Sequence, residues 1–405
     1  MLSSSAHFTK SETLIVQFML QRLLLTRAIG TIMVRDHFSQ IGLVMSATDQ
    51  TAKHGLQNSS RREFLTRAAC LTALGCSSVA MPGCVQRPDS EYLPDRVWGR
   101  SGLSDGMMKK PRAMVMSPKD ELYIVDKSGR IHVFDPNAAD IGKALNNKPP
   151  KGAFLRAWNT PMIKQGKPTG LGWSNDDQLL VADTHYYRVL FYDPDGTRDE
   201  TKVIGGEYGD EAGQFHFVTD VAQDQRGHFF VGQYGQIDRI QEFDPERNFI
   251  RMWGSQGAGP SEFSRPQALH IDEEGLLWVA DACNHRIQVF DVQSKGTDPE
   301  LVKMWGKPGN EIGALKTPYG MDFDQDGTLL IAEFGNHRVQ RFSREGEVLE
   351  CWGGPGVATG QYQDPWALAL DSKRNIHVLD TGNCRVQRYR PNSTYRLPKE
   401  KSQTI

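Results

Sequence analysis

The sequence carries almost no net charge, because 47 lysines and arginines oppose 49 aspartates and glutamates. A nucleic-acid partner usually requires a basic face, so this balance argues against one. The six cysteines contain no C-x-x-C pair of the zinc type, and their scatter does not fit a disulfide framework. Segment 13–34 is apolar, yet Gln17, Gln21, Arg22 and Arg27 interrupt it and make it a poor membrane helix.

Turn-forming residues, by contrast, are abundant. The chain has 39 glycines, 21 prolines and 8 tryptophans. Frequent glycine and proline with regularly placed aromatics favour many short strands joined by tight turns. An apolar content of 39% is ordinary for a soluble protein and allows a large core.

The region 59–84 has the features of an export signal. Arg61 and Arg62 are followed by Phe64, Leu65 and a mild apolar stretch. This S-R-R-x-F-L pattern resembles a twin-arginine signal, which a receptor reads and whose passenger crosses the membrane already folded. The alternative is a chance basic pair before a loose helix. We expect export by the twin-arginine route to the periplasm or cell envelope.

Two cysteines in this region raise the question of a lipid anchor. Cys76 follows Ala-Leu-Gly and Cys84 follows Met-Pro-Gly, contexts that permit lipid modification but also fit an ordinary cleavage region. Because the first residues lie awkwardly upstream of a signal, we expect translation to start at Met33 or Met45. The predicted organisation is a leader with signal and linker, 1–90, a repeat domain, 91–395, and a tail, 396–405.

One phrase recurs six times after the leader. Each copy contains an aromatic–glycine pair, a strand that usually opens with proline, an acidic–glycine turn, a second strand and a third strand that begins with arginine. The second strands end at Asp126, Asp183, Gln233, Asp281, Glu333 and Asp380. Four short strands per roughly 50 residues form one propeller blade. We therefore predict an all-β fold, a six-bladed β-propeller with four-stranded antiparallel blades.

The two ends of the repeat domain complement each other. The last repeat ends after Tyr389 without a fourth strand, whereas an unpaired strand with Trp98-Gly99 lies in residues 92–99. The N-terminal strand is therefore predicted to complete the last blade and close the ring, and trimming residues 90–100 is expected to destabilise it.

The phrases at 253–290 and 316–342 resemble NHL repeats, and the resemblance extends over about residues 92–390. The resemblance implies a six-bladed propeller but no single function. Some NHL-type propellers are zinc-dependent peptidylamidoglycolate lyases, with histidines after the strand-one proline. The corresponding positions here hold Arg, Thr, Thr, Gln, Tyr and Trp, which places that activity in doubt.

Most of the recurring residues have structural explanations. We expect Asp281 with Arg286, and Glu333 with Arg338, to form a hydrogen-bonded clamp between the second and third strands. The tryptophans and glycines at the ends of the fourth strands are expected to pack between blades and to form tight turns: Trp253, Trp305, Trp352, Gly254, Gly306 and Gly353.

Two apparent metal motifs are weak. His285, His337 and Cys384 occupy equivalent positions on neighbouring blades, which lie on the order of 10 Å apart, whereas zinc ligands must lie about 2 Å from the ion. The segment 322–327, DFDQDG, resembles the start of a calcium loop, with Glu333 at position twelve. We interpret it instead as a turn between strands.

Function is expected at the face where the second strand connects to the third and the fourth to the next blade, around the channel mouth. The residue after the strand-one proline varies there from blade to blade, and the neighbouring loops add aromatics and amides. The candidate ligand-binding residues are Arg112, Thr169, His185, Tyr187, Thr219, Tyr234, Gln267, Asn284, Tyr319, Asn336 and Trp366.

This composition suits a protein, peptide or carbohydrate ligand. No convergent acid, base, nucleophile or metal set is evident, so we predict a monomeric binding module with no catalytic residues, metal or cofactor. The alternative is a propeller enzyme, either lyase-like or a lactonase-like hydrolase, although no cage of carboxylates and amides for calcium is apparent. RNA binding, known in some NHL propellers, conflicts with the neutral charge.

Overall fold

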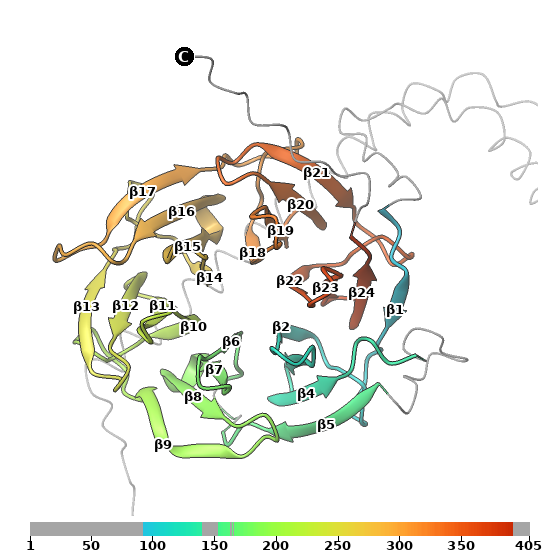
Figure 1. Cartoon of the computed structure of the whole chain (residues 1–405), viewed down its shortest axis with the longest axis horizontal. Coiled ribbons are helices and arrows are strands. Elements are labelled where there is room, and N and C mark those ends of the chain that lie inside the picture. Colours follow the sequence, from blue (N-terminus) through green and yellow to red (C-terminus); the bar gives the residue numbers. More distant parts are fainter. Residues whose placement is uncertain (1–91, 140–152, 163, 165, 392–405) are drawn as a thin grey trace, which may run out of the picture. The chain divides into compact units, whose positions relative to one another are not determined.

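The strands of the computed structural model form six four-stranded sheets arranged in a ring around a central channel (Figure 1). The structure describes residues 92–139, 153–162, 164 and 166–391. The predicted leader and tail lie outside these residues. Within them, no helix is long and apolar enough to cross a membrane. The predicted six-bladed, all-β propeller is confirmed.

Each blade runs from an inner strand to an outer one. Blades 1 to 3 consist of β2 (Pro111–Met116), β3 (Leu122–Asp126), β4 (Arg130–Phe134), β5 (Phe154–Asn159); β6 (Gly170–Trp173), β7 (Leu179–Asp183), β8 (Arg188–Tyr192), β9 (Arg198–Gly205); and β10 (Phe217–Gln223), β11 (Phe229–Tyr234), β12 (Arg239–Phe243), β13 (Phe249–Trp253). Blades 4 to 6 consist of β14 (Pro266–Ile271), β15 (Leu276–Asp281), β16 (Arg286–Asp291), β17 (Glu300–Trp305); β18 (Pro318–Phe323), β19 (Leu329–Glu333), β20 (Arg338–Phe342), β21 (Val348–Gly353); and β22 (Pro365–Leu370), β23 (Ile376–Asp380), β24 (Arg385–Tyr389), β1 (Arg96–Trp98). Short 3₁₀ turns follow β7 and β15 as η3 (Thr184–Tyr186) and η4 (Ala282–Asn284).

The ring is closed by the strand from the N-terminal side, as predicted. β1 pairs antiparallel with β24, with Arg96 opposite Arg388 and Trp98 opposite Val386. The Asp95 carboxylate also binds the Arg388 guanidinium, which fixes this register. Figure 1 shows β1 beside β24 at the outer edge of the last blade. Only three residues of the predicted segment 92–99 are strand, but they join the two ends of the propeller.

The core lies between neighbouring blades rather than within one. Trp253 of blade 3 is 5% exposed and packs in one cluster with Leu269 and Phe290 of blade 4. The rings of Trp305 and Phe342, and of Trp352 and Tyr389, make the same contact in the next two blades, with centroids 5.0 and 5.8 Å apart. The prediction that these tryptophans pack between blades is confirmed.

The predicted clamps are also present. Arg286 Nε donates to Asp281 Oδ2 at 2.7 Å, and Arg338 Nε donates to Glu333 Oε1 at 2.6 Å. The remaining guanidinium nitrogens of Arg286 donate to carbonyl oxygens of the preceding loop, those of Ala258, Gly259 and Glu262. Each clamp therefore ties the loop that enters a blade to its second and third strands.

A β-bulge at the start of the inner strand leaves one residue outside the strand ladder at the channel mouth. In β14, Pro266 pairs with Asp281 and Ala268 pairs with Ala280, so Gln267 is left outside the ladder. The same irregularity follows Pro111, Pro318 and Pro365. A bulge redirects the side chain of its extra residue. The repeat thus frees one side chain per bulged blade, at the position that varies most in sequence.

Candidate functional site

The inner strands enclose a central cavity of about 370 Å³. Five of the eleven candidate residues line it: Arg112, Thr169, Gln267, Tyr319 and Trp366. Each comes from a different blade and lies at or just before the start of its inner strand. The mouth is therefore assembled by the ring as a whole, so it requires a closed propeller.

Two arginines stack on aromatic rings at and beside this mouth. The Arg112 guanidinium lies 5.6 Å from the Trp366 ring centroid. The Arg265 guanidinium lies 4.7 Å from the Tyr234 ring and 5.1 Å from the Tyr319 ring. The Tyr319 and Trp366 rings are themselves 4.7 Å apart. We call these five residues, Tyr234, Arg265, Tyr319, Trp366 and Arg112, the arginine–aromatic arc.

Neither guanidinium of the arc forms an ion pair with a carboxylate among the described residues. Arg265 Nε donates to Gln267 Oε1 at 2.8 Å. Burial lowers the pKa of Arg112, and the positive charge of Arg265 acts in the same direction. Arg112 nevertheless remains protonated at neutral pH, as arginine does in proteins. Asp238 Oδ2 accepts from the Arg265 backbone amide at 2.6 Å, and the charges of Asp238 and Arg265 attract each other. Arg112 is therefore the arginine of the mouth whose charge the described residues leave uncompensated.

The two threonines of the candidate set make contacts between blades. Thr169 Oγ1 lies 2.7 Å from Thr184 Oγ1 and also donates to the Thr219 carbonyl oxygen. Thr219 Oγ1 donates to the Pro266 carbonyl oxygen at 2.5 Å, and Thr219 is fully buried and does not line the cavity. These hydroxyls are thus used in holding neighbouring inner strands together.

His185 and Tyr187 lie beside blade 3 rather than on the cavity wall. The His185 ring is 5.2 Å from the Phe217 ring, and the Tyr187 ring is 5.1 Å from the Tyr208 ring. Burial lowers the pKa of His185, and the charge of Arg112 contributes to the same shift. The structure therefore does not bring these two side chains together with the arc.

Asn284 and Asn336 belong to the clamps. Asn284 Nδ2 donates to the Gly257 carbonyl oxygen at 2.7 Å and to Asp281 at 2.9 Å. Asn336 Nδ2 makes the equivalent bonds to Gly309 and Glu333. The side-chain amides are therefore engaged within their own blades.

The residues of the apparent metal motifs form hydrogen bonds and turns within the propeller. His285 Nδ1 accepts from the Thr317 backbone amide at 2.9 Å, and His337 Nδ1 accepts from the Asp364 amide at 3.1 Å. Both histidines, like Cys384, have a left-handed backbone. Segment 322–327 is the turn between β18 and β19, as predicted. In the described part of the chain, no three His, Cys, Asp or Glu side chains are placed to hold a metal ion.

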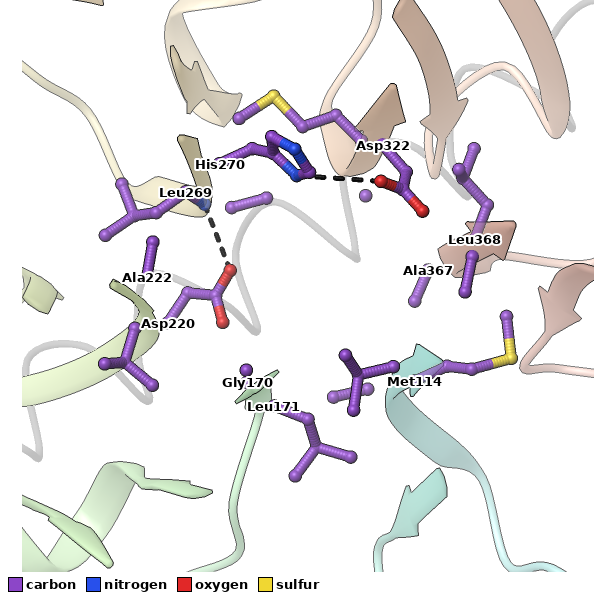
Figure 2. Close-up of a pocket in the computed structure, with 18 of the residues that line it drawn as sticks. Met114, Gly170, Leu171, Asp220, Ala222, Leu269, His270, Asp322, Ala367 and Leu368 are labelled. Carbon is purple, nitrogen blue, oxygen red and sulfur yellow. Dashed lines mark hydrogen bonds and ion pairs between the residues drawn. The ribbon is translucent and has the colours of Figure 1, made fainter. Parts of the chain in front are cut away.

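Three polar side chains that were not among the predicted site residues lie further along the cavity. Asp220, His270 and Asp322 line its wall, and Figure 2 shows them facing a space whose other walls are largely apolar. His270 Nδ1 lies 3.6 Å from Asp322 Oδ1. Burial raises the pKa of Asp220 to about 7, against backbone hydrogen bonds from Leu269 and Val221 that lower it. Burial also raises the pKa of Asp322, and His270 opposes that shift.

For Asp220, the sequence does contain an indication. With the blades aligned by strand pairing, the second residue after the strand-opening position is Ala113, Gly170, Asp220, Ala268, Gly320 or Ala367. Five of the six are small, and one is a carboxylate. Arg265 was missed for a different reason, because it precedes the strand-opening proline rather than following it.

Known proteins similar to this chain include one named for its NHL repeats and others named as enzymes. NHL repeat-containing protein 3 of Mus musculus is 31% identical over 193 residues, covering 44% of this chain and 52% of that protein. Peptidyl-glycine alpha-amidating monooxygenase B of Xenopus laevis is 34% identical over 232 residues, covering 52% of this chain and 26% of that protein. Diisopropyl-fluorophosphatase of Loligo vulgaris is 25% identical over 254 residues, covering 56% of this chain and 76% of that protein.

The chain thus spans about half the length of the mouse relative and about a quarter of the frog one. The model of the family described as SMP-30/Gluconolactonase/LRE-like region matches residues 113–362, more than half of the chain. That match begins in the first inner strand and ends just before the last blade. The chain therefore belongs to the SMP-30/gluconolactonase/LRE-like family, as a six-bladed propeller built from NHL-type repeats.

Proposed function

We propose that this propeller is a binding module whose channel mouth captures an anionic group, most simply a carboxylate, of a small ligand or peptide. The observation that carries the proposal is Arg112, which lines the cavity at its mouth and forms no ion pair with a carboxylate of the described residues, with the Arg265 guanidinium nearby over the Tyr319 ring. An arginine held in a half-buried position without a counter-charge is costly unless a ligand supplies one. Its planar fork also matches a carboxylate.

An aromatic cluster that includes two rings of the arc favours a ligand with an aromatic or otherwise planar body. Tyr319, Phe334 and Trp366 contact one another, with ring centroids 4.7 to 5.6 Å apart. Rings held in this way present apolar surface at little entropic cost. A ligand that places its carboxylate at the arginines and a ring or apolar side chain against the three aromatic rings would contact both parts of the mouth.

Benzoate and its neutral analogue benzamide test the proposal by isothermal titration calorimetry. We expect benzoate to bind, benzamide to bind more weakly, and Arg112→Gln or Arg265→Gln to lower benzoate affinity about tenfold or more, because a charged hydrogen bond contributes about 1.5–3 kcal/mol. Arg247→Gln, in the turn between β12 and β13 at the other end of the blade, is the matched control and should have no effect. Equal binding of benzoate and benzamide would refute the proposal.

Catalysis is the second candidate function, and the enzyme names among the relatives favour it. A lyase of the amidating type would cleave the N–Cα bond of a peptidyl-α-hydroxyglycine to give a peptide amide and glyoxylate, so the assay is the appearance of both products. Retention of the substrate unchanged would favour the binding module. Formation of the amide would replace the binding function with an enzymatic one at the same mouth.

We also propose export by the twin-arginine route. Arg61 and Arg62 lie in the leader, outside the described residues, and β1 begins at Arg96. Because β1 pairs with β24, the ring closes only after the whole chain has been synthesised. A route that accepts folded passengers suits such a protein. The test is the location of the protein after Arg61→Lys and Arg62→Lys are combined, with retention in the cytoplasm expected.

A further inference from the structure

The central cavity separates its charges along the channel. Arg112 lines it at the start of an inner strand, whereas Asp220, His270 and Asp322 line it further along their strands. Asp220 lies one residue beyond the mouth position, and Asp322 lies three residues beyond it. With a rise of about 3.3 Å per residue, the carboxylates lie roughly 3 to 10 Å below the mouth. One cavity therefore has a cationic entrance and an anionic interior.

Asp220 is a half-buried carboxylate that forms no ion pair with a cation among the described residues. Asp220 Oδ2 accepts a hydrogen bond from the Leu269 backbone amide at 3.0 Å, which fixes its orientation. A Cβ on Gly170, in the neighbouring blade, would lie 2.6 Å from Asp220 Oδ1, so glycine at that position is what leaves room for the carboxylate.

Asp322 is held in a similar way but has a titratable neighbour. Asp322 Oδ2 accepts from the Leu370 backbone amide at 3.0 Å, and its other oxygen lies 3.6 Å from His270 Nδ1. Figure 2 shows Asp322 and His270 side by side, with Met114 and Leu368 on the cavity wall beyond them. The interior thus offers carboxylate oxygens beside an apolar wall.

We propose that the cavity binds a small zwitterion, an amino acid or dipeptide, with its carboxylate at Arg112 and Arg265 and its ammonium group at Asp220. This inference rests on the anion site proposed above and adds the cationic half of the ligand. A half-buried carboxylate without a counter-charge is costly, and a bound ammonium supplies three donors and the missing charge. Two extended residues span about 7 Å. Arg112 and Asp220 lie in β2 and β10, on blades 1 and 3, so the ligand crosses the channel as well as descending it. A leucine side chain at the inner residue would lie against Met114 and Leu368.

Three related probes separate the two halves of the site. Leucylglycine has both charges, N-acetyl-leucylglycine lacks the ammonium group, and leucylglycinamide lacks the carboxylate. In calorimetric titrations of the propeller, we expect leucylglycine to bind about tenfold or more tightly than either blocked probe, since each lost charge removes a charged hydrogen bond.

Variants assign each charge to its residue. Asp220→Asn should weaken leucylglycine about tenfold but leave N-acetyl-leucylglycine within about twofold, because the acetylated probe has no charge for Asp220 to bind. Arg112→Gln should weaken both probes that have a carboxylate and leave leucylglycinamide within the same range. Thermal melts establish that each variant is folded, and Asp322→Asn provides a second variant of the interior.

The outcomes distinguish the two proposals. If N-acetyl-leucylglycine binds through Arg112 as tightly as leucylglycine does, the anion site stands and the zwitterion inference fails. If Asp220→Asn weakens the free and the acetylated probes equally, Asp220 shapes the cavity without binding an ammonium group, and the inference fails. Calcium binding that Asp220→Asn abolishes, with no preference for the free amine, also overturns it. If no probe binds at millimolar concentration, both proposals fail.

Discussion

Asp220→Asn should make the propeller more stable at alkaline pH and less stable at acidic pH. Burial raises the pKa of Asp220 from 3.8 to about 7, although backbone hydrogen bonds from Leu269 and Val221 lower it. The folded protein therefore holds this proton more tightly than the unfolded chain does. The stability that the protonated group contributes is present below about pH 4 and is lost as the pH rises through about 7.

The magnitude follows from the same shift. Each tenfold change in an ionisation constant corresponds to about 1.4 kcal/mol, so ionising Asp220 costs about 4 kcal/mol of folding free energy at about pH 8. Asparagine avoids this cost but replaces one acceptor oxygen with an amide group, and the lost hydrogen bond costs about 1 kcal/mol. Asp220→Asn is thus expected to be about 3 kcal/mol more stable than the parent at about pH 8 and about 1 kcal/mol less stable near pH 4.

Urea denaturation followed by tryptophan fluorescence, from about pH 4 to pH 9, measures this difference. The charged or titratable groups that line the cavity with Asp220 are Arg112 on β2, His270 on β14, and Tyr319 and Asp322 on β18, while Gly170 on β6 brings none. Asp298→Asn, at an exposed aspartate between β16 and β17, is the control and should change stability equally at every pH. A difference for Asp220→Asn that does not vary with pH would refute the assignment of a half-buried, uncompensated carboxylate.

The other predictions concern the ring, the clamp and the mouth. Trp98→Ala should lower the free energy of unfolding by about 3–5 kcal/mol, because Trp98 is 3% exposed and its ring lies 4.6 Å from that of Phe134. Leu93→Ala, at a 46% exposed residue just before the same strand, should have little effect in the same urea titration; equal losses would argue against closure by β1. Asn336→Ala should cost about 1–3 kcal/mol through its bonds to Gly309 and Glu333, yet leave benzoate affinity unchanged. A loss of affinity without a loss of stability would instead place Asn336 in the ligand site. Raising the salt concentration should weaken benzoate binding to the parent protein more than to Arg112→Gln, because screening acts on the charge that the variant lacks.

The sequence predicted the fold well because the fold consists of repeated local patterns. The strand-opening proline, the acidic end of the second strand and the arginine that opens the third strand recur in nearly every blade, and each specifies a local hydrogen bond or turn. Ring closure was also predictable, because one blade lacked a strand that the other end of the domain supplied. Such features need only a count of copies and the pairing rules of strands.

The candidate site was predicted less completely, because proximity around the mouth depends on side-chain direction. Asn284 and Asn336 have the residue type of a binding site, yet their amides are turned into the clamps. Arg265 has a left-handed backbone, with φ of 62°, which a reading of strands alone does not reveal. Its stacking between Tyr234 and Tyr319 joins three blades and has no counterpart within a single repeat.

Repetition itself indicates where function must lie. A residue that is present in all six blades recurs around the channel and stabilises the propeller, as the clamp arginines do. A ligand without sixfold symmetry can be recognised only where the copies differ. The second residue after the strand-opening position is small in five blades because neighbouring inner strands approach closely there. A Cβ on Gly320, for example, would lie 2.7 Å from Ala367 Cα. Blade 3 has the Asp220 carboxylate at this position, and Gly170 of blade 2 allows its strand to approach both the Thr219 carbonyl oxygen and Asp220. A Cβ on Gly170 would lie 2.3 Å from the Thr219 carbonyl oxygen and 2.6 Å from Asp220 Oδ1. Gly170→Ala should therefore displace the β10 backbone together with Asp220, lower the free energy of unfolding and weaken leucylglycine more than N-acetyl-leucylglycine.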